Sequence, residues 1–205
     1  MPKAWKSDTM TDKTGYLTPS QVIEIVQQCE NERDWLLITL LFRTGRRVSE
    51  VLDLKPNMIL QDKQALVLPI LKKRTKGDPP TGIVYLDYKI FCKLIEYIEK
   101  ARIPPDGYVF QSPIRDNHIN RHRVYQIVRR LGEKAGIYYV GTKRLHPHHF
   151  RHSFAIEASN TLQNPADLRA LQELMGHSSI AITEFYLKFD ERKAKSLVSR
   201  MWKDK

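Results

Sequence analysis

The chain contains little cysteine and no long apolar run. Only Cys29 and Cys92 occur among its 205 residues, and they are too far apart to form a C-x-x-C pair. The simplest inference is a reduced intracellular compartment. No apolar stretch approaches the roughly 20 residues that a membrane span requires. The polar segment after Met1 also lacks the apolar region of a signal peptide. We therefore expect a cytoplasmic protein with no membrane partner.

Acidic residues are scarce relative to basic ones. Asp and Glu total 23 against 34 Lys and Arg, which gives a formal net charge of +11 and a pI near 9.6. This balance is typical of nucleic-acid binding, although basic soluble proteins with other partners exist. Such charge supplies affinity for DNA through counterion release and says nothing about sequence preference. The length and the hydrophobic content of 41% predict one sizeable soluble domain.

The apolar periodicity predicts a mainly α domain with one small antiparallel β-hairpin. Thr18-Pro19-Ser20-Gln21 has the features of a helix start, with a cap, a proline at the first position and a capping-box glutamine. No internal repeat or low-complexity linker interrupts the chain. Helices are expected over residues 21–29, 32–42, from 49, 88–100, 120–135, 149–159, 165–175, 180–185 and 192–202, and strands over 65–71 and 82–86.

Four histidines and one arginine lie close together in the sequence between residues 146 and 152. His148 and Arg151 have i, i+3 spacing, so both would project from one helix face, which suits an anion such as phosphate. The alternative is a solvated basic helix end. His148 and His152 also have the spacing of a helical zinc pair, with His146 and His149 nearby. A zinc hydrolase is less favoured because no H-E-x-x-H glutamate is present and Arg151 would bring positive charge toward the cation.

A second basic segment runs from Thr44 to Glu50. Gly45 permits a tight turn between two helices, and Glu50 fits the first turn of the second helix. One of the two arginines, Arg46 or Arg47, can face inward with its fork available for two phosphate oxygens. Glu50 can then orient a functional group. The alternative is a capped turn with arginines on the surface.

A hairpin lysine and a late tyrosine complete the candidate groups. Basic residues on or beside the expected hairpin are usually solvated, but a lysine at its tip can reach a reaction centre and act as a general acid. Tyr186 follows His177 by nine positions. A tyrosine at a helix end usually lies in the core or at its rim, so its place in the order of motifs is what singles it out. The hairpin residues are Lys72, Lys73, Arg74 and Lys76.

These segments, in this order, resemble the tyrosine recombinases, also called the phage integrase family. The family pattern T-G-x-R-x-S-E is matched by Thr44 to Glu50, and H-x-L-R-H by His148 to His152. L-G-H is matched by Met175 to His177, and a tyrosine follows nine residues later. The resemblance covers residues 17 to 202. It implies the DNA breaking-rejoining fold, which is mainly α with a small antiparallel β-sheet.

The chain departs from the family pattern at three positions. Arg46 stands where an apolar residue is usual, Phe150 where leucine is common, and Met175 replaces leucine before Gly-His. Many relatives also carry an N-terminal helical core-binding domain that closes around DNA, and this chain has no room for one. We expect either an isolated catalytic domain or a naturally minimal protein.

The resemblance also implies a domain layout and a catalytic set. Residues 18–191 would form the catalytic domain, and 192–205 a C-terminal helix or tail that packs on its own domain or on a neighbouring subunit. Residues 1–17 are expected to form a flexible arm because they are polar and lack periodicity. Neither a metal nor a cofactor is implied. The implied catalytic residues are Arg47, Lys76, His148, Arg151, His177 and Tyr186, with Lys73 as the alternative to Lys76.

The implied activity is site-specific cleavage and rejoining of double-stranded DNA through a 3′-phosphotyrosyl intermediate. Tyr186 would attack a phosphate, two arginines would hold its non-bridging oxygens, and the hairpin lysine would protonate the leaving 5′-oxygen. His148 would help to remove the phenol proton, and His177 would add a hydrogen bond to the phosphate.

The resemblance further implies a tetramer on DNA and a monomer without it. The protein would be associated with the nucleoid in a prokaryote, or act in the host cell if it is viral. Two alternatives remain: a type IB topoisomerase-like enzyme that relaxes DNA, and a DNA-binding module without catalysis.

Overall fold

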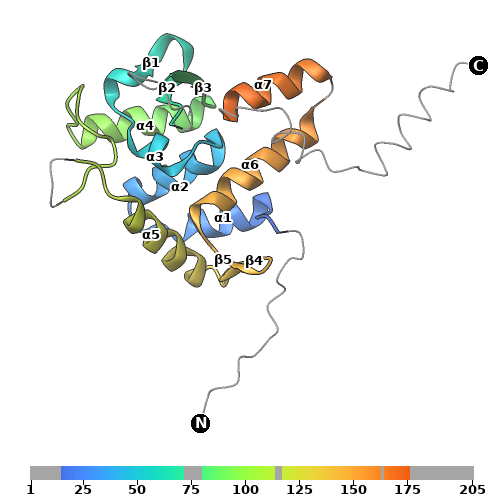
Figure 1. The fold of residues 1–205 in the computed structure, drawn as a ribbon. Helices are drawn as coiled ribbons and strands as arrows, with labels where there is room; N and C mark the ends of the chain where they lie inside the picture. Colours follow the sequence, from blue (N-terminus) through green and yellow to red (C-terminus); the bar gives the residue numbers. More distant parts are fainter. Residues whose placement is uncertain (1–14, 72–79, 114–116, 163, 176–205) are drawn as a thin grey trace, which may run out of the picture.

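A computed structural model of the chain describes residues 15–71, 80–113, 117–162 and 164–175 (Figure 1). This part is mainly helical, as the sequence predicts. None of its helices is long and apolar enough to cross a lipid bilayer. The helices are α1 (Pro19–Gln27), α2 (Glu32–Thr44), α3 (Val48–Leu52), α4 (Tyr88–Lys100), α5 (Arg121–Lys134), α6 (Pro147–Thr161) and α7 (Pro165–Met175), with short 3₁₀ turns η1 (Pro56–Met58) and η2 (Gln61–Lys63). The helices expected over 180–185 and 192–202 lie outside the described residues.

In the described residues, two small antiparallel sheets accompany the helices. The predicted hairpin is confirmed: β2 (Ala65–Pro69) pairs with β3 (Thr81–Tyr85), with Ala65 opposite Tyr85 and Pro69 opposite Thr81. The sequence did not reveal the short strand β1 (Ile59–Leu60) on the other edge of β2, nor the hairpin of β4 (Tyr139–Val140) and β5 (Lys143–Arg144). Two-residue strands are too short to show an alternating pattern.

The start of α1 confirms the predicted capping box. The Thr18 hydroxyl accepts from the backbone N–H of Gln21 at 3.3 Å, and the Gln21 side chain accepts from the Thr18 N–H at 2.9 Å. The assignment of Leu17 to a flexible arm is wrong. Leu17 is fully buried, and its N–H donates to the Ser153 hydroxyl at 2.8 Å. An apolar residue directly before the cap therefore packs onto the core. Residues 1–14 lie outside the described part, so the rest of the arm stays a prediction.

Helix α2 lies at the centre of the core. It packs against α1, α3, α4 and α6, and its residues from Leu36 to Leu41 are all buried. A helix that is buried on every side is held by apolar contacts in all directions, at about 1.5–3 kcal/mol for each large side chain. A smaller apolar cluster of Ala155, Leu171 and Met175 joins α6 to α7. These contacts bring the end of α7 near the turn that follows α2.

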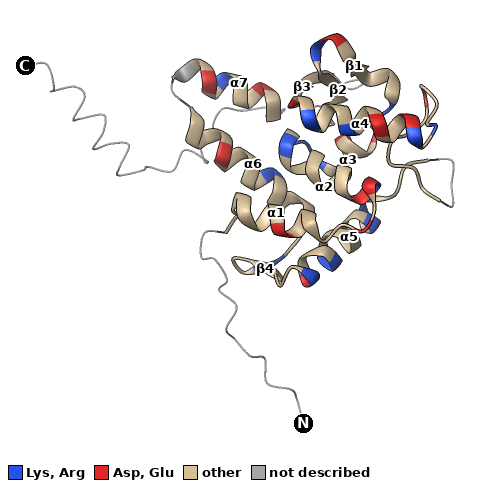
Figure 2. Cartoon of the chain, turned by 180° about the vertical axis from the view of Figure 1, so that it is seen from behind, with Lys and Arg blue, Asp and Glu red and all other residues tan. Residues whose placement is uncertain are grey.

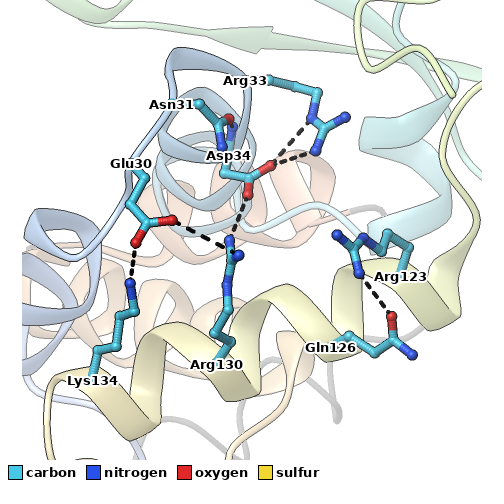
Figure 3. A network of polar contacts seen from close by, with 8 residues as sticks. All are labelled: Glu30, Asn31, Arg33, Asp34, Arg123, Gln126, Arg130 and Lys134. Atoms are coloured by element: carbon cyan, nitrogen blue, oxygen red, sulfur yellow. Dashed lines mark hydrogen bonds and ion pairs between the residues drawn. The ribbon is translucent and has the colours of Figure 1, made fainter. Parts of the chain in front are cut away.

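A polar network fixes α5 against the start of α2 (Figure 3). The Asp34 carboxylate is almost fully buried and pairs with Arg33 at 2.9 Å and Arg130 at 3.2 Å. Beside it, Lys134 pairs with Glu30. The network matters for the site because α5 also carries Arg121 and Tyr125, which line the smaller of the two cavities described below. The helix is strongly basic, with five Lys or Arg residues and one Glu (Figure 2).

Candidate active site

The turn between α2 and α3 carries two adjacent arginines. Gly45 ends α2 with φ of 60°, a left-handed conformation that favours glycine. A Cβ at this position would also overlap the Phe154 ring of α6. Glycine is therefore required here both for the turn and for the close approach of α6. Arg46 and Arg47 follow directly.

Glu50 fixes the orientation of Arg47. Its side chain is fully buried. One carboxylate oxygen accepts from the backbone N–H of Arg47 at 3.0 Å, and the other accepts from Arg47 Nη1 at 2.9 Å and from the Leu71 N–H at 3.3 Å. Glu50 thus joins Arg47 to the end of the β2 strand. Charge-assisted bonds of this kind hold a guanidinium more firmly than neutral ones do.

Arg151 joins two distant parts of the chain from its place on α6. The residue is 6% exposed, and its guanidinium donates to the Gly45 carbonyl at 2.6 Å and to the Met175 carbonyl at 2.8 Å. These bonds connect the turn after α2 to the last residue of α7. They also fix the plane of the guanidinium within the site.

One small cavity brings His148 together with Arg47 and Arg151. This cavity of about 80 Å³ is lined by Arg46, Arg47, Val48, Ser49, Arg121, Tyr125, Pro147, His148 and Arg151. Burial lowers the pKa of His148 below its ordinary value of 6.5, and the nearby charges of Arg151 and Arg47 lower it further. The imidazole is therefore neutral at neutral pH and able to accept a proton.

A larger cavity shares His148 and Arg151 with the small one. It has a volume of about 490 Å³, and its wall combines the first turns of α6 with the β4–β5 hairpin. Lys143 and Arg151 contribute positive charge to this wall. The lining residues are Gly15, Val140, Gly141, Thr142, Lys143, His146, His148, His149, Arg151 and His152.

The histidines beside this cavity hold the start of α6. His149 stacks on His146 with ring centroids 3.9 Å apart, and its Nδ1 accepts from the His146 N–H at 3.2 Å. Burial, together with the neighbouring His146 and His152, lowers the pKa of His149 to about 3. In the described part of the chain, no three His, Cys, Asp or Glu side chains are grouped to hold a metal ion.

The low pKa of His149 predicts acid lability. The folded state favours the neutral ring of His149, so protonation of this ring favours unfolding. The stability that the neutral ring provides is fully present above pH 6.5 and is lost as the pH falls toward 3. The loss is about 1.4 kcal/mol per pH unit. A glutamine at this capping-box position can accept the same N–H. His149→Gln is therefore expected to flatten the decline in unfolding free energy, by up to about 3 kcal/mol between pH 6.5 and 4.

Urea denaturation at several pH values measures this difference. His122→Gln, at an exposed position on α5, is the matched control and is expected to decline in parallel with the wild type. Equal slopes for His149→Gln and the wild type would contradict the assignment.

The structure brings together three of the six predicted site residues. Arg47, His148 and Arg151 line one cavity. Lys76, its alternative Lys73, His177 and Tyr186 lie outside the described residues, so their roles stay predictions.

Sequence reasoning missed two lining residues of the small cavity, Arg121 and Tyr125. Their i, i+4 spacing on a basic helix places them on one face, and that was the available signal. It did not show which face of α5 would point toward His148.

Comparison with known proteins identifies the family. The model of the phage integrase family matches residues 15–193. A tyrosine recombinase of Pseudothermotoga lettingae is 34% identical over 174 residues, which cover 84% of this chain and 55% of that protein. The tyrosine recombinase XerA of Pyrococcus horikoshii is 27% identical over 90% of this chain and 60% of that protein. The chain therefore spans little more than half the length of these relatives.

A solved structure shows the same fold. The XerH site-specific recombinase, bound to a palindromic difH substrate in a post-cleavage complex, superposes with a TM-score of 0.70. The match has 22% identity and covers 92% of this chain and 53% of that one. The fold is that of the tyrosine recombinase catalytic domains, as the resemblance implied. The chain belongs to the phage integrase family.

Proposed function

We propose that this chain is the catalytic domain of a site-specific recombinase that cleaves and rejoins DNA through a 3′-phosphotyrosyl intermediate. The observation that carries the proposal is the small cavity lined by Arg47, His148 and Arg151. It combines two oriented guanidinium groups with a neutral imidazole. Cleavage of a phosphodiester by a phenol requires both kinds of group. The guanidinium groups stabilise the negative charge that grows on the phosphate oxygens, and the imidazole accepts the proton that the phenol loses.

The roles of the described residues follow from their positions. Arg47, held by Glu50, and Arg151, held by two carbonyl oxygens, stabilise the non-bridging oxygens of the phosphate in the transition state. His148 accepts the phenol proton, since burial and the two arginines keep its ring neutral. A phenol with an ordinary pKa near 10 needs such a base at neutral pH.

The remaining roles belong to Tyr186, Lys76 and His177, all within the segment that matches the family. The phenol oxygen forms a bond to phosphorus as the bond from phosphorus to the 5′-oxygen breaks. Lys76 gives a proton to that 5′-oxygen, and His177 donates a hydrogen bond to the phosphate. Attack by another strand's 5′-hydroxyl reverses these steps and releases the tyrosine, so no nucleotide is consumed.

The partner that we propose is double-stranded DNA. The net charge of +11 and the basic helix α5 favour a phosphate backbone, and the similar XerH structure holds its difH substrate. We further propose a cytoplasmic protein that is monomeric alone and tetrameric on two duplexes, with residues 192–205 packing on their own domain or on a neighbouring subunit. A topoisomerase activity is not favoured, because the similar curated proteins are recombinases.

A nicked suicide duplex carrying the element's own attachment sequence tests the proposal. Cleavage releases a short 5′-hydroxyl fragment that diffuses away and leaves the protein trapped on DNA. We expect a covalent protein–DNA band in denaturing gels, with the same yield in EDTA and without nucleotide. DNA binding without any covalent band would contradict the enzymatic proposal. A two-site recombination assay beside plasmid relaxation then separates a recombinase from a topoisomerase.

A further inference from the structure

Arg46 is a buried charge that the proposed mechanism does not use. The residue is 1% exposed and belongs to the largest fully buried side chains of the described part. Its Nε, Nη1 and Nη2 atoms find no hydrogen-bond acceptor in that part. An unpaired buried guanidinium is costly, because five N–H donors have lost water without gaining another partner. Such a group in a native fold calls for an explanation.

The immediate surroundings of Arg46 do not neutralise it. The closest candidate is the buried Glu50, but its oxygens accept from the Arg47 N–H groups and the Leu71 N–H. The pKa of Arg46 is lowered by burial and only partly restored by Glu50. The guanidinium lies against Gly82 of β3, where a Cβ would overlap Nη2. Glycine at 82 thus makes the space that this side chain occupies.

Arg46 also lines the small cavity, beside Arg47, His148 and Arg151. The cavity of about 80 Å³ has room for several waters, at roughly 10–15 Å³ each, and so for one phosphate group. A cation that solvent does not reach is poorly screened, so it attracts an anion in this cavity more strongly than an exposed lysine would.

We propose that Arg46 is an additional phosphate-binding residue, which stabilises a DNA phosphate group in the cavity of Arg47 and Arg151. The inference rests on the proposed function for the identity of its ligand. It goes beyond the family pattern, because an apolar residue is usual at this position. The chain keeps a buried arginine there at a cost to its own stability, and a bound phosphate offsets that cost.

Binding of inorganic phosphate tests the role of Arg46 without any recombination assay. The dissociation constant is measured by phosphorus NMR at constant ionic strength for the wild type and for Arg46→Leu, which restores an apolar residue. We expect Arg46→Leu to bind phosphate roughly tenfold more weakly, because a poorly screened positive charge beside the cavity is lost. In phosphate-free buffer its Tm is expected to rise by roughly 2–4 °C or more, because the unpaired charge is gone. Arg43→Leu, which removes an exposed arginine on α2, is the matched control with unchanged phosphate binding.

A second variant perturbs the guanidinium without removing its charge. Gly82→Ala places a methyl group where Arg46 Nη2 now lies, so it is expected to weaken phosphate binding in the wild type. In a protein that already carries Arg46→Leu, Gly82→Ala is expected to leave phosphate binding unchanged. The wild type, the two single variants and the double variant together form a double-mutant cycle. If Arg46→Leu does not fold, Gly82→Ala alone remains a test.

Phosphate binding within twofold of the wild type, in folded Arg46→Leu or in folded Gly82→Ala, overturns the inference. This outcome is distinguishable from failure of the proposed function. A covalent DNA complex with unchanged phosphate binding in Arg46→Leu leaves the recombinase standing and removes only the role of Arg46. If Arg46→Leu binds phosphate more weakly but the wild type forms no covalent DNA complex, the role of Arg46 in phosphate binding stands and the recombinase activity is contradicted.

Discussion

Replacing Tyr186 by phenylalanine is expected to reduce the covalent complex with a nicked suicide duplex to below detection. The substitution removes one oxygen atom, and that atom is the proposed nucleophile. Loss of a nucleophile commonly lowers a rate by about 10⁶-fold, because no other group takes over the bond to the substrate. Non-covalent DNA binding is expected to remain within about twofold, since the charge of the protein does not change.

Two further measurements make the Tyr186→Phe result specific. Tyr85→Phe removes the hydroxyl of an exposed tyrosine on β3 and is expected to form the complex at the wild-type level. Mobility shifts on intact duplex confirm that Tyr186→Phe still binds DNA. A covalent complex that persists in Tyr186→Phe would show that another residue attacks the phosphate.

The second large effect concerns Arg151. Arg151→Lys keeps the positive charge but loses the planar fork that contacts both Gly45 and Met175. We expect the rate of covalent complex formation to fall by about 10²–10³-fold, the usual effect of removing one donor to a developing oxyanion. Arg151→Ala is expected also to destabilise the fold by about 2–5 kcal/mol, because two buried carbonyl oxygens lose their partner.

Single-turnover cleavage and urea denaturation separate the two roles of Arg151. Arg169→Lys, at an exposed position on α7, is the control and is expected to match the wild type in both measurements. A rate for Arg151→Lys within threefold of the wild type would contradict a direct role in phosphate binding. A loss of stability without a loss of rate would make Arg151 a purely structural residue.

Much of the fold could be predicted because the local signals agreed with the tertiary structure. The predicted bounds of the helices over Tyr88–Lys100 and Pro165–Met175 are those of α4 and α7. The first of these helices begins after Asp87, whose side chain accepts from the Ile90 N–H. By contrast, the burial of Leu17 and the two-residue strands depend on contacts between distant segments. Those contacts leave no periodic pattern in a short stretch of sequence.

The site was predictable where spacing alone places groups together. His148 and Arg151 share a face of α6 because they are three residues apart, and the motif order linked them to Arg47. Spacing could not distinguish the environments of Arg46 and Arg47. The two arginines are adjacent, yet Arg47 pairs with Glu50 while Arg46 is buried against β3. That difference arises from the packing of the β2–β3 hairpin on the turn after α2.

In the proposed mechanism, Tyr186 becomes linked to DNA within a site built by Arg47, His148 and Arg151. Its most direct test is the chemical identity of the protein–DNA linkage. Trypsin digestion of the trapped complex releases a peptide of residues 170–188, which contains Tyr186 as its only tyrosine. Mass spectrometry after nuclease treatment is predicted to find this peptide joined to a nucleotide 3′-phosphate at Tyr186. A nucleotide attached to any other residue, or attached through a 5′-phosphate, would contradict the proposed mechanism.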